Sequence, residues 1–219
     1  MAGKLKIGVL ASGRGSNLQA IIDAVEAGQV QAQLAVVISN KADAPALERA
    51  RTHGAPALFL DPKPFAGRPD AREAYDRGVL DALRKHDVEL VLLAGYMKIV
   101  TPVLIDAYRN RMMNIHPSLL PTFPGLEVQK KAIEWGVKIS GCTVHFVTEG
   151  VDEGPIIIQA AVPVKDDDTP ETLAARILIE EHRIFPRAVQ LYAEGRLRVE
   201  GRRVVCTGAS PAGGSLVVP

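Results

Sequence analysis

Apolar and polar positions in the first half of the chain follow two periods. Short continuous apolar runs suit strands that are buried on both faces of a parallel sheet. Between these runs, apolar residues recur at helical spacing, and a segment with three prolines predicts a loop. Strands are predicted at 7–11, 34–38, 57–60 and 90–94, helices at 18–25, 45–53 and 71–85, and the loop at 61–70. This alternation predicts an α/β fold with a doubly wound, mainly parallel sheet of Rossmann-like type.

The second half has a different rhythm, in which strands follow one another with fewer helices between them. This pattern predicts an antiparallel C-terminal portion of the sheet. Strands are predicted at 112–116, 139–147 and 156–164, helices near 128–135 and at 169–190, and a hairpin at 197–205. Thr169 is expected to cap the long helix, with Pro170 in its first turn. We expect Pro186 to kink this helix or end it early, because proline lacks the N–H and clashes with the preceding turn.

The length of 219 residues suits one α/β domain, or one such domain with a small appendage. We expect a single domain at 1–205, with an N-terminal half of about 1–110 and a C-terminal half of about 111–205. The last segment, 206–219, is rich in Gly, Ser, Ala and Pro and is predicted to be a flexible tail.

Charge and cysteine content narrow the functional classes. The 26 Lys and Arg residues balance the 25 Asp and Glu residues, and no basic run interleaved with aromatic residues indicates a nucleic-acid partner. No apolar run reaches membrane length, so a cytoplasmic protein is expected. Cys142 and Cys206 form no CxxC pair, which favours neither zinc nor a redox dithiol. Cys142 is expected to be a buried, inert thiol.

A glycine-containing loop follows the first predicted strand and opens the first helix. Its residues are Ser12, Gly13, Arg14, Gly15, Ser16 and Asn17. Backbone N–H groups at a helix start bind anions. A dinucleotide site is disfavoured, because Leu18 stands at the third glycine position and Asn40 lies where a ribose-binding acid is expected. The loop therefore predicts a monophosphate site, with a plain tight turn as the alternative.

Asn114 and His116 are candidates for catalysis at the end of a predicted strand. Side chains alternate along a strand, so both project from one face while Ile115 faces the other. An amide donor beside an imidazole can stabilise a developing oxyanion. The alternative is a strand end that carries a hydrogen-bonded histidine and no catalytic role.

A polar loop between two apolar strands supplies a candidate carboxylate. Asp152 is the preferred acid, although the spacing leaves Glu149 and Glu153 open. A carboxylate beside His116 would favour the imidazolium form near neutral pH. His145 is expected to contact a ligand, with an exposed strand position as the alternative, and Ser118 is expected to cap a loop. No nucleophile elbow or metal-ligand spacing is present in the sequence, so direct transfer without a covalent enzyme intermediate is expected.

Together these segments resemble the glycinamide ribonucleotide formyltransferases, which are folate-dependent enzymes. The resemblance spans about residues 6–198. It rests on the glycine loop with Leu18-Gln19-Ala20-Ile21, on Ser39-Asn40-Lys41-Ala42-Asp43, Leu93-Ala94-Gly95-Tyr96-Met97, Asn114-Ile115-His116-Pro117-Ser118-Leu119-Leu120-Pro121 and Gly141-Cys142-Thr143-Val144-His145-Phe146-Val147, and on Val151-Asp152-Glu153-Gly154-Pro155 with Glu181-His182.

The resemblance implies transfer of a formyl group from 10-formyltetrahydrofolate to the amine of glycinamide ribonucleotide, in the biosynthesis of purines. It implies that Asn114, His116 and Asp152 are catalytic and that no metal takes part. The residues implied to bind the ribonucleotide are Gly13, Gly15, Ser16, Asn17, Pro117 and Glu181. Those implied to bind folate are Arg72, Met97, Lys98, Ile99, Val100, Asn114, Val147, Thr148, Val151 and Asp152. Both ligands are small molecules, no nucleic acid or membrane is expected, and the protein is expected to be a monomer or a homodimer.

Three alternatives stay open at this point. A formyltetrahydrofolate hydrolase would use water in place of the amine, and its relatives carry an added N-terminal regulatory domain. A methionyl-tRNA formyltransferase would need an RNA-binding domain and a basic surface. A non-catalytic nucleotide-binding module would keep the glycine loop without needing Asn114, His116 and Asp152 together.

Overall fold

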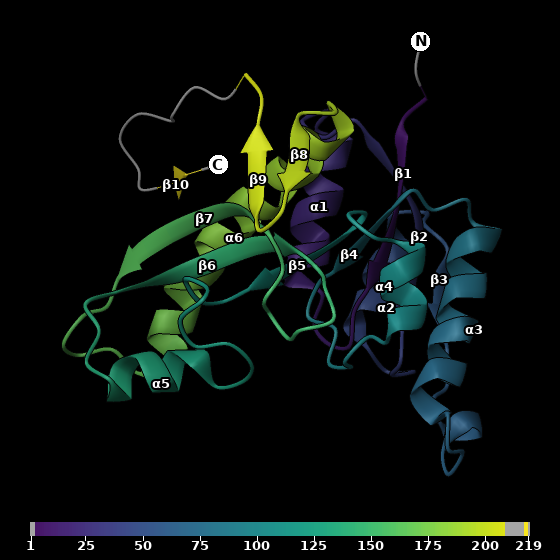
Figure 1. Cartoon of the computed structure of the whole chain (residues 1–219), viewed down its shortest axis with the longest axis horizontal. Helices are drawn as coiled ribbons and strands as arrows, with labels where there is room; N and C mark the ends of the chain where they lie inside the picture. The colour runs from purple at the N-terminus through teal and green to yellow at the C-terminus, as the bar shows by residue number, and fades with distance from the viewer. Residues whose placement is uncertain (1–2, 209–216, 219) are drawn as a thin grey trace. The chain divides into compact units, whose positions relative to one another are not determined.

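The computed structural model describes residues 3–208 and 217–218. The chain divides into two compact units, Met1–Met113 and Asn114–Pro219. Figure 1 shows the elements of both units. Their boundary lies close to the predicted division of the chain into halves at about residue 110. That the halves form one domain stays a prediction.

Unit 1 alternates strands and helices, as its apolar pattern predicts. Its elements are β1 (Leu5–Leu10), α1 (Ser16–Glu26), β2 (Ala32–Ser39), α2 (Pro45–Thr52), β3 (Ala57–Phe59), the 3-10 helix η1 (Lys63–Phe65), α3 (Ala71–Lys85), β4 (Leu90–Leu93) and α4 (Pro102–Ala107). The helix α4 and the turn η1 were not expected from the sequence. Both are short and begin beside a proline, so neither has room for a helical apolar period.

The strands of unit 1 pair in the order β3-β2-β1-β4, and each of the pairings β2–β3, β1–β2 and β1–β4 is parallel. All four residues of β4 are buried, as are the last four of β1. This burial on both faces explains why the strands appear in the sequence as continuous apolar runs rather than as alternating ones. The chain runs from β1 through β2 to β3 on one side, and β4 lies on the other side of β1.

The strand β5 (Met112–His116) crosses from unit 1 into unit 2. The remaining elements of unit 2 are α5 (Val128–Glu134), β6 (Ile139–Phe146), β7 (Ile156–Pro163), α6 (Pro170–Ala193), β8 (Leu197–Glu200), β9 (Arg203–Cys206) and β10 (Val217–Val218). β6 and β7 form an antiparallel pair, and α6 packs on both strands (Figure 1). β8 and β9 form the predicted hairpin. The predicted fold class, a mainly parallel sheet with an antiparallel C-terminal portion, is confirmed.

The helix α6 excludes one of the two outcomes expected at Pro186. It does not end early there but continues to Ala193, while a kink stays a prediction. Beyond the proline, Ala188, Val189 and Leu191 are fully buried. Packing of this apolar face against β6 and β7 compensates for the hydrogen bond that proline cannot donate. The N-terminal cap agrees with the prediction, since the Thr169 hydroxyl accepts from the Thr172 N–H at 3.3 Å.

The described residues of the predicted flexible tail are ordered by pairing: Cys206 ends β9 opposite Leu197, and the Thr207 N–H donates to the Arg196 carbonyl at 3.0 Å. β10 pairs in antiparallel fashion with β7, with Val217 opposite Ala160. Residues 209–216 and 219, on which the rest of that prediction falls, lie outside the described residues.

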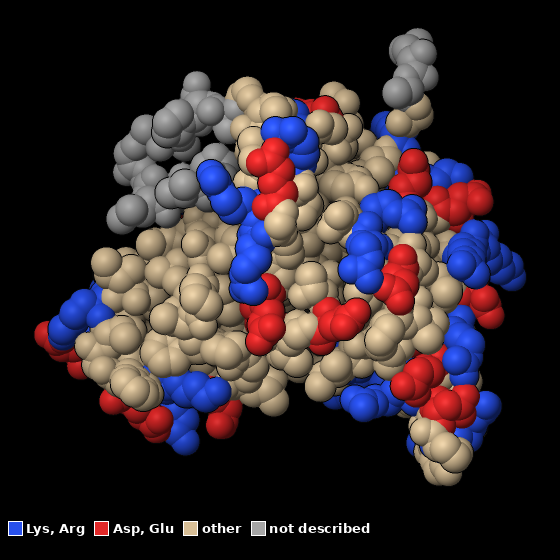
Figure 2. All heavy atoms as spheres, in the orientation of Figure 1, with Lys and Arg blue, Asp and Glu red and all other residues tan. Residues whose placement is uncertain are grey.

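Charged side chains are interspersed over the face of the molecule that Figure 2 shows, with Lys and Arg close to Asp and Glu. This distribution agrees with the net charge of +1. Within the described residues, no helix combines the length and the apolar composition that crossing a membrane requires.

Candidate active site

The glycine loop of unit 1 presents backbone groups at the start of α1. Gly15 is the N-cap of this helix and has left-handed dihedral angles, φ 71° and ψ 31°. A Cβ at Gly15 would lie 2.9 Å from the Cα of Ala46, so a side chain is excluded on two grounds. The N–H groups of Ser16 and Asn17 belong to the first turn, where the helix offers no acceptor. The geometry suits an anion at this point.

The loop lies at a topological switch point of the unit 1 sheet. It follows the carboxyl end of β1, which pairs with β2 on one side and β4 on the other. Open α/β sheets bind ligands outside the carboxyl ends of strands at such points. The position of the loop and the dipole of α1 thus both favour binding of an anionic ligand at this point.

The helix α2 holds the glycine loop through contacts that the sequence did not reveal. The Ala46 N–H donates to the Gly13 carbonyl at 3.2 Å, and the Arg49 Nε–H donates to the Arg14 carbonyl at 2.9 Å. Arg49 also donates from Nη1 to the Gln19 side chain at 2.9 Å. Arg49 has no apolar period or motif to single it out, so its role emerges only from the tertiary contact.

Four of the residues expected to contact folate line one pocket in unit 1. The pocket measures about 180 Å³, and its lining residues are Arg72, Asp76, Met97, Lys98 and Ile99. Pockets for whole drug-sized ligands usually measure about 300–1,000 Å³. The pocket therefore has room for part of a folate molecule. The expected contact Val100 follows this set in the chain but is not one of the lining residues.

Asp76 is a buried acid of this pocket that the sequence analysis missed. Its carboxylate accepts from the Thr101 N–H at 2.6 Å, and 2% of the residue is exposed. Burial raises the pKa of Asp76, and the Thr101 N–H and the positive charge of Lys98 oppose that effect. Lys98 stands over the ring of Tyr75, with its Nζ 4.7 Å from the centroid. This cation–π contact directs the ammonium group of Lys98.

In unit 2, the end of β5 carries Asn114 and His116 on one face, while Ile115 is buried in the alternate position. The Asn114 Nδ2 lies 3.2 Å from the His145 Nε2 and 3.4 Å from the Asp152 Oδ1. The His116 Nδ1 lies 3.3 Å from the Asp152 Oδ2. We call Asn114, His116, His145 and Asp152 the polar cluster. The cluster joins the three residues that the resemblance implies to be catalytic.

His116 has an oxygen acceptor beside each of its ring nitrogens. Its Nε2–H donates to the Phe123 carbonyl at 2.9 Å, and its Nδ1 faces Asp152. Burial nevertheless lowers the pKa of His116, and this effect outweighs the Phe123 carbonyl and the Asp152 charge, which raise it. Burial of the ring therefore works against the expectation that Asp152 keeps the imidazole protonated near neutral pH. The carboxylate acts in the expected direction, but desolvation of the ring is the larger effect.

Asp152 is the acid of its loop that contacts His116, and Glu149 and Glu153 are exposed. The Gly125 N–H donates to the Asp152 Oδ2 at 2.9 Å. Burial acts to raise the pKa of Asp152, but the His145 ring, the Gly125 N–H and the His116 ring together lower it. Asp152 thus stays ionised at neutral pH. Its φ of 56° places a non-glycine residue in the left-handed region, a strain that often accompanies functional sites.

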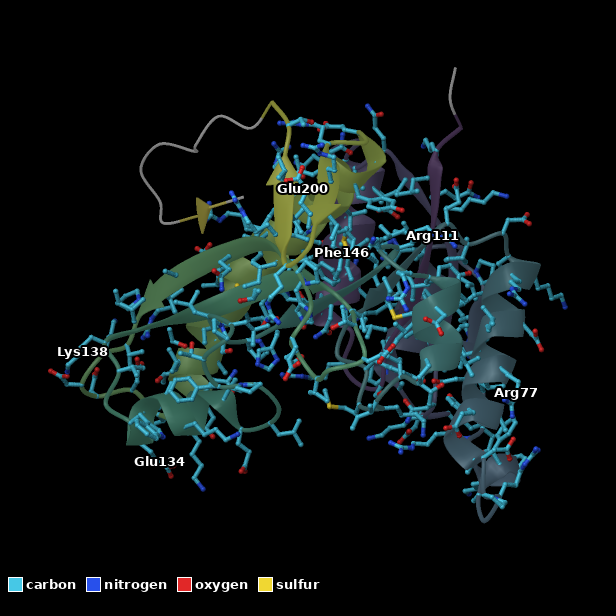
Figure 3. The ribbon with its side chains drawn as sticks, viewed as in Figure 1. Arg77, Arg111, Glu134, Lys138, Phe146 and Glu200 are labelled. Atoms are coloured by element: carbon cyan, nitrogen blue, oxygen red, sulfur yellow. The ribbon has the colours of Figure 1, made fainter. Side chains whose placement is uncertain are left out.

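His145 belongs to the polar cluster, although sequence spacing could not decide between a ligand contact and an exposed strand position. The residue is 2% exposed. Its Nδ1–H donates to the carbonyl of Phe146 at 2.9 Å, which leaves Nε2 to accept from the amide of Asn114. Phe146 is labelled in Figure 3, at the end of β6. A Cβ at Gly154 would lie 1.7 Å from the same Phe146 carbonyl, so a glycine is required at that position.

Several other residues expected in the site are neighbours of the polar cluster in the sequence, whereas Glu181 lies on α6. Pro117 follows β5, Val147 and Thr148 follow β6, and Val151, which is 50% exposed, precedes Asp152. Glu181 is buried on α6. Burial raises the pKa of Cys142, and the negative charge of Glu181 adds to that effect. The thiol of Cys142 is fully buried, as expected.

Ser118 has the loop-capping role expected of it. Its hydroxyl donates to the Thr122 carbonyl at 2.6 Å, within the loop that also supplies the Phe123 carbonyl. The described residues contain no group of three or more His, Cys, Asp or Glu side chains that could hold a metal ion.

The family model described as "Formyl transferase" matches residues 5–189. The chain belongs to the formyl transferase family. The phosphoribosylglycinamide formyltransferase of Escherichia coli is 44% identical over 195 residues, which are 89% of this chain and 90% of that protein. The crystal structure of glycinamide ribonucleotide transformylase 1 from Symbiobacterium toebii is 55% identical, with a TM-score of 0.90, and the match covers 94% of this chain and 95% of that one. The predicted resemblance is thereby confirmed.

Some relatives of this family member are much longer. The trifunctional purine biosynthetic protein adenosine-3 of Drosophila pseudoobscura is 50% identical over 195 residues, which are 88% of this chain. The match spans 14% of the length of that protein.

Proposed function

We propose that this chain transfers the formyl group of 10-formyltetrahydrofolate to the amine of glycinamide ribonucleotide, a step in the biosynthesis of purines. The observation that carries this proposal is the polar cluster, in which an amide, an imidazole and an ionised carboxylate converge at the end of β5. Similarity to proteins named for this activity supports the choice of both substrates. A second observation, the glycine loop at the start of α1, suits the phosphate of a ribonucleotide.

In the proposed reaction, the acceptor amine attacks the formyl carbon. A new C–N bond forms, the bond from that carbon to the folate nitrogen breaks, and one amine proton has to reach the departing nitrogen. The protein therefore has two tasks, which are to stabilise the negative charge that develops on the formyl oxygen and to move a proton.

Asn114 is proposed to supply a donor for the developing charge. Its amide is oriented by His145, whose Nδ1–H is committed to the Phe146 carbonyl. One N–H of this amide bonds His145, and the other, which faces the Asp152 Oδ1 at 3.4 Å, is proposed to turn to the formyl oxygen as the charge forms. His116 is proposed to exchange its bond to Phe123 for a bond to the formyl oxygen, because in its present position both ring nitrogens face protein oxygens.

Asp152 is proposed to assist proton transfer as an ionised base. The lowered pKa of its carboxyl group keeps it ionised at neutral pH, with its charge beside His116. The lowered pKa of His116 makes the neutral ring the resting form, so a proton gained during turnover is readily released. This assignment of protonation states differs from the one expected from the sequence, in which a carboxylate favours the imidazolium form of His116.

For the remaining contacts, we propose that the N–H groups of Gly15, Ser16 and Asn17 hold the substrate phosphate. The pocket with Arg72, Met97 and Lys98 is proposed to take part of the folate, since its cationic side chains suit a carboxylate tail. We further propose that the protein works in the cytoplasm on these two small molecules, without a metal, as a monomer or a homodimer.

The test is deformylation of 10-formyltetrahydrofolate by the purified chain, with and without glycinamide ribonucleotide. The proposal expects deformylation that depends on the ribonucleotide and yields an equal amount of its formylated product. Equal rates in both reactions, with release of formate, would instead establish a hydrolase. Binding of both ligands without turnover would indicate a non-catalytic module.

A further inference from the structure

Ser12 occupies the junction of three strand ends in unit 1. Its hydroxyl donates to the Asn40 Oδ1 at 2.6 Å and accepts from the Met97 N–H at 2.8 Å. Its own N–H donates to the Gly95 carbonyl at 3.0 Å. Ser12 is 2% exposed, so these partners replace water around the hydroxyl. Asn40 directly follows β2, Ser12 and Gly95 lie two residues after β1 and β4, and Met97 lies four residues after β4.

The segment that Ser12 holds has no regular structure of its own. Residues 94–101 lie between β4 and α4 and form neither helix nor strand. Two buried side chains fix its backbone, with Ser12 bound to the Met97 N–H and Asp76 bound to the Thr101 N–H. The pocket residues Met97, Lys98 and Ile99 lie between these two attachments.

The two attachments differ in what they connect. Asp76 belongs to α3, whereas Ser12 is the first residue of the glycine loop and is followed directly by Gly13. Gly13 and Gly95 are both exposed, and a Cβ would meet no atom within 4 Å at either position. Both the Ser12 N–H and the Ser12 hydroxyl connect the glycine loop to residues 94–101, and the hydroxyl is the side-chain connection between them.

We propose that Ser12 is a positioning residue that couples binding at the glycine loop to binding at the pocket beside Met97. This inference rests on the proposed function for the identity of the two ligands. A phosphate bound at the glycine loop orders that loop, and with it the Ser12 hydroxyl. Met97 is then held in the position that the second ligand requires, so the second ligand meets a smaller ordering cost. The coupling is reciprocal by thermodynamic necessity.

The test uses glycinamide ribonucleotide with tetrahydrofolate, which lacks the formyl group and so forms a non-reacting ternary complex. Calorimetry gives the Kd of tetrahydrofolate with and without saturating ribonucleotide. For the unaltered chain, we expect the ribonucleotide to tighten tetrahydrofolate binding by about fivefold or more. In Ser12→Ala we expect this factor to fall to about one. With the natural substrates, both KM values should rise about tenfold in Ser12→Ala, while kcat at saturation changes little.

Ser39→Ala is the matched control. Ser39 is also a fully buried serine at the end of a neighbouring strand, and its hydroxyl accepts the Lys41 N–H at 3.1 Å. It makes no bond to residues 94–101, so its loss should leave the coupling factor unchanged. Asn40→Ala serves if Ser12→Ala fails to fold. It removes the acceptor that orients the Ser12 hydroxyl while the hydroxyl remains, and an intermediate loss of coupling is expected.

The outcomes separate this inference from the proposed function. Coupling in the unaltered chain that survives in Ser12→Ala and Asn40→Ala would overturn the inference and leave the function intact. Turnover of both substrates by the unaltered chain, without any effect of the ribonucleotide on tetrahydrofolate binding, would also overturn the inference and leave the function intact. Failure of the unaltered chain to bind either ligand would instead remove the proposed function. An equal loss of coupling in Ser39→Ala would show that Ser12 acts only through stability.

Discussion

The glycine loop of unit 1 and the polar cluster of unit 2 offer their functional groups in opposite ways. The loop offers backbone N–H groups, and the identity of most of its side chains matters little so long as Gly15 keeps its left-handed φ of 71°. The cluster offers side chains, each oriented by another, such as Asn114 by His145. A backbone site is therefore sensitive to conformation, and a side-chain site is sensitive to chemistry.

Their electrostatics also differ. At the loop, attraction for an anion comes from the start of α1 and needs no titratable group. In the polar cluster, burial lowers the pKa of His116, whereas the two histidine rings and the Gly125 N–H lower the pKa of Asp152. Of these two regions, only the polar cluster is thus expected to make activity or stability depend on pH near neutrality.

The largest effect should come from removing a donor in the polar cluster. Asn114→Ala is expected to lower kcat by about 10²–10³, which is typical for loss of one donor to a developing oxyanion. His116→Ala should cost at least as much, because it removes both a donor and a proton carrier. Steady-state kinetics with both substrates measures these effects. A rate near that of the unaltered chain for Asn114→Ala would contradict its role.

A change of charge at Asp152 tests whether the two regions work separately. Asp152→Asn keeps the shape and an acceptor for the Gly125 N–H but removes the base. We expect kcat to fall by about 10² or more, while the Kd of glycinamide ribonucleotide stays unchanged. Calorimetry beside the kinetics provides both readouts. A large loss of ribonucleotide affinity would mean that Asp152 is a substrate contact.

A matched pair of glycine substitutions tests the backbone site. Gly15→Ala adds a Cβ 2.9 Å from Ala46 at a φ of 71°, whereas a Cβ at Gly13 meets no atom within 4 Å. We expect Gly15→Ala to raise the KM for the ribonucleotide about tenfold and Gly13→Ala to raise it much less. Similar KM values for the two variants would show that the loop conformation does not set phosphate affinity.

Most of the fold could be predicted from apolar periodicity. Runs such as 90–94 coincide with buried strands because parallel strands between two layers have no solvent face. Pro186 shows the limit of local reasoning, since proline predicts a helix end but packing of α6 on β6 and β7 overrides it. Packing of this kind joins segments that are distant in the sequence, so a local window cannot register it.

The residues of the site were predictable where they belong to a recognisable sequence motif. Asn114, His116 and Asp152 do lie in contact, as the resemblance implies. Their protonation was not predictable, because the balance between burial and the charge of Asp152 depends on how closely the loop covers the ring of His116. Ser12 and Arg49 were overlooked as supports for a related reason. A lone serine or arginine carries no signal until its partner, Met97 or Arg14, is placed beside it.

The smallest expected effect is a pH dependence of stability that belongs to the polar cluster alone. Burial holds the pKa of His116 below its ordinary value of 6.5. As the pH falls through about 6.5, the unfolded chain binds a proton at this histidine that the folded chain does not bind, so the folded state loses stability. The lowered pKa of Asp152 also stabilises the folded state, but this contribution is lost only at more acid pH, below its ordinary value of 3.8.

His116→Asn removes this titration while leaving the glycine loop untouched. The free energy of unfolding in urea, measured from pH 7 to pH 5, should fall less steeply in the variant than in the unaltered chain. The slopes are compared rather than the absolute values, because the substitution itself changes stability. His145 and Lys131 also act on the His116 ring, so the ionic strength is kept constant. Parallel curves would mean that His116 titrates alike in the folded and unfolded chains, and a steeper curve in the variant would reverse the sign argued here. A shallower curve would tie the acid sensitivity to the buried side-chain site and leave the backbone site independent of pH.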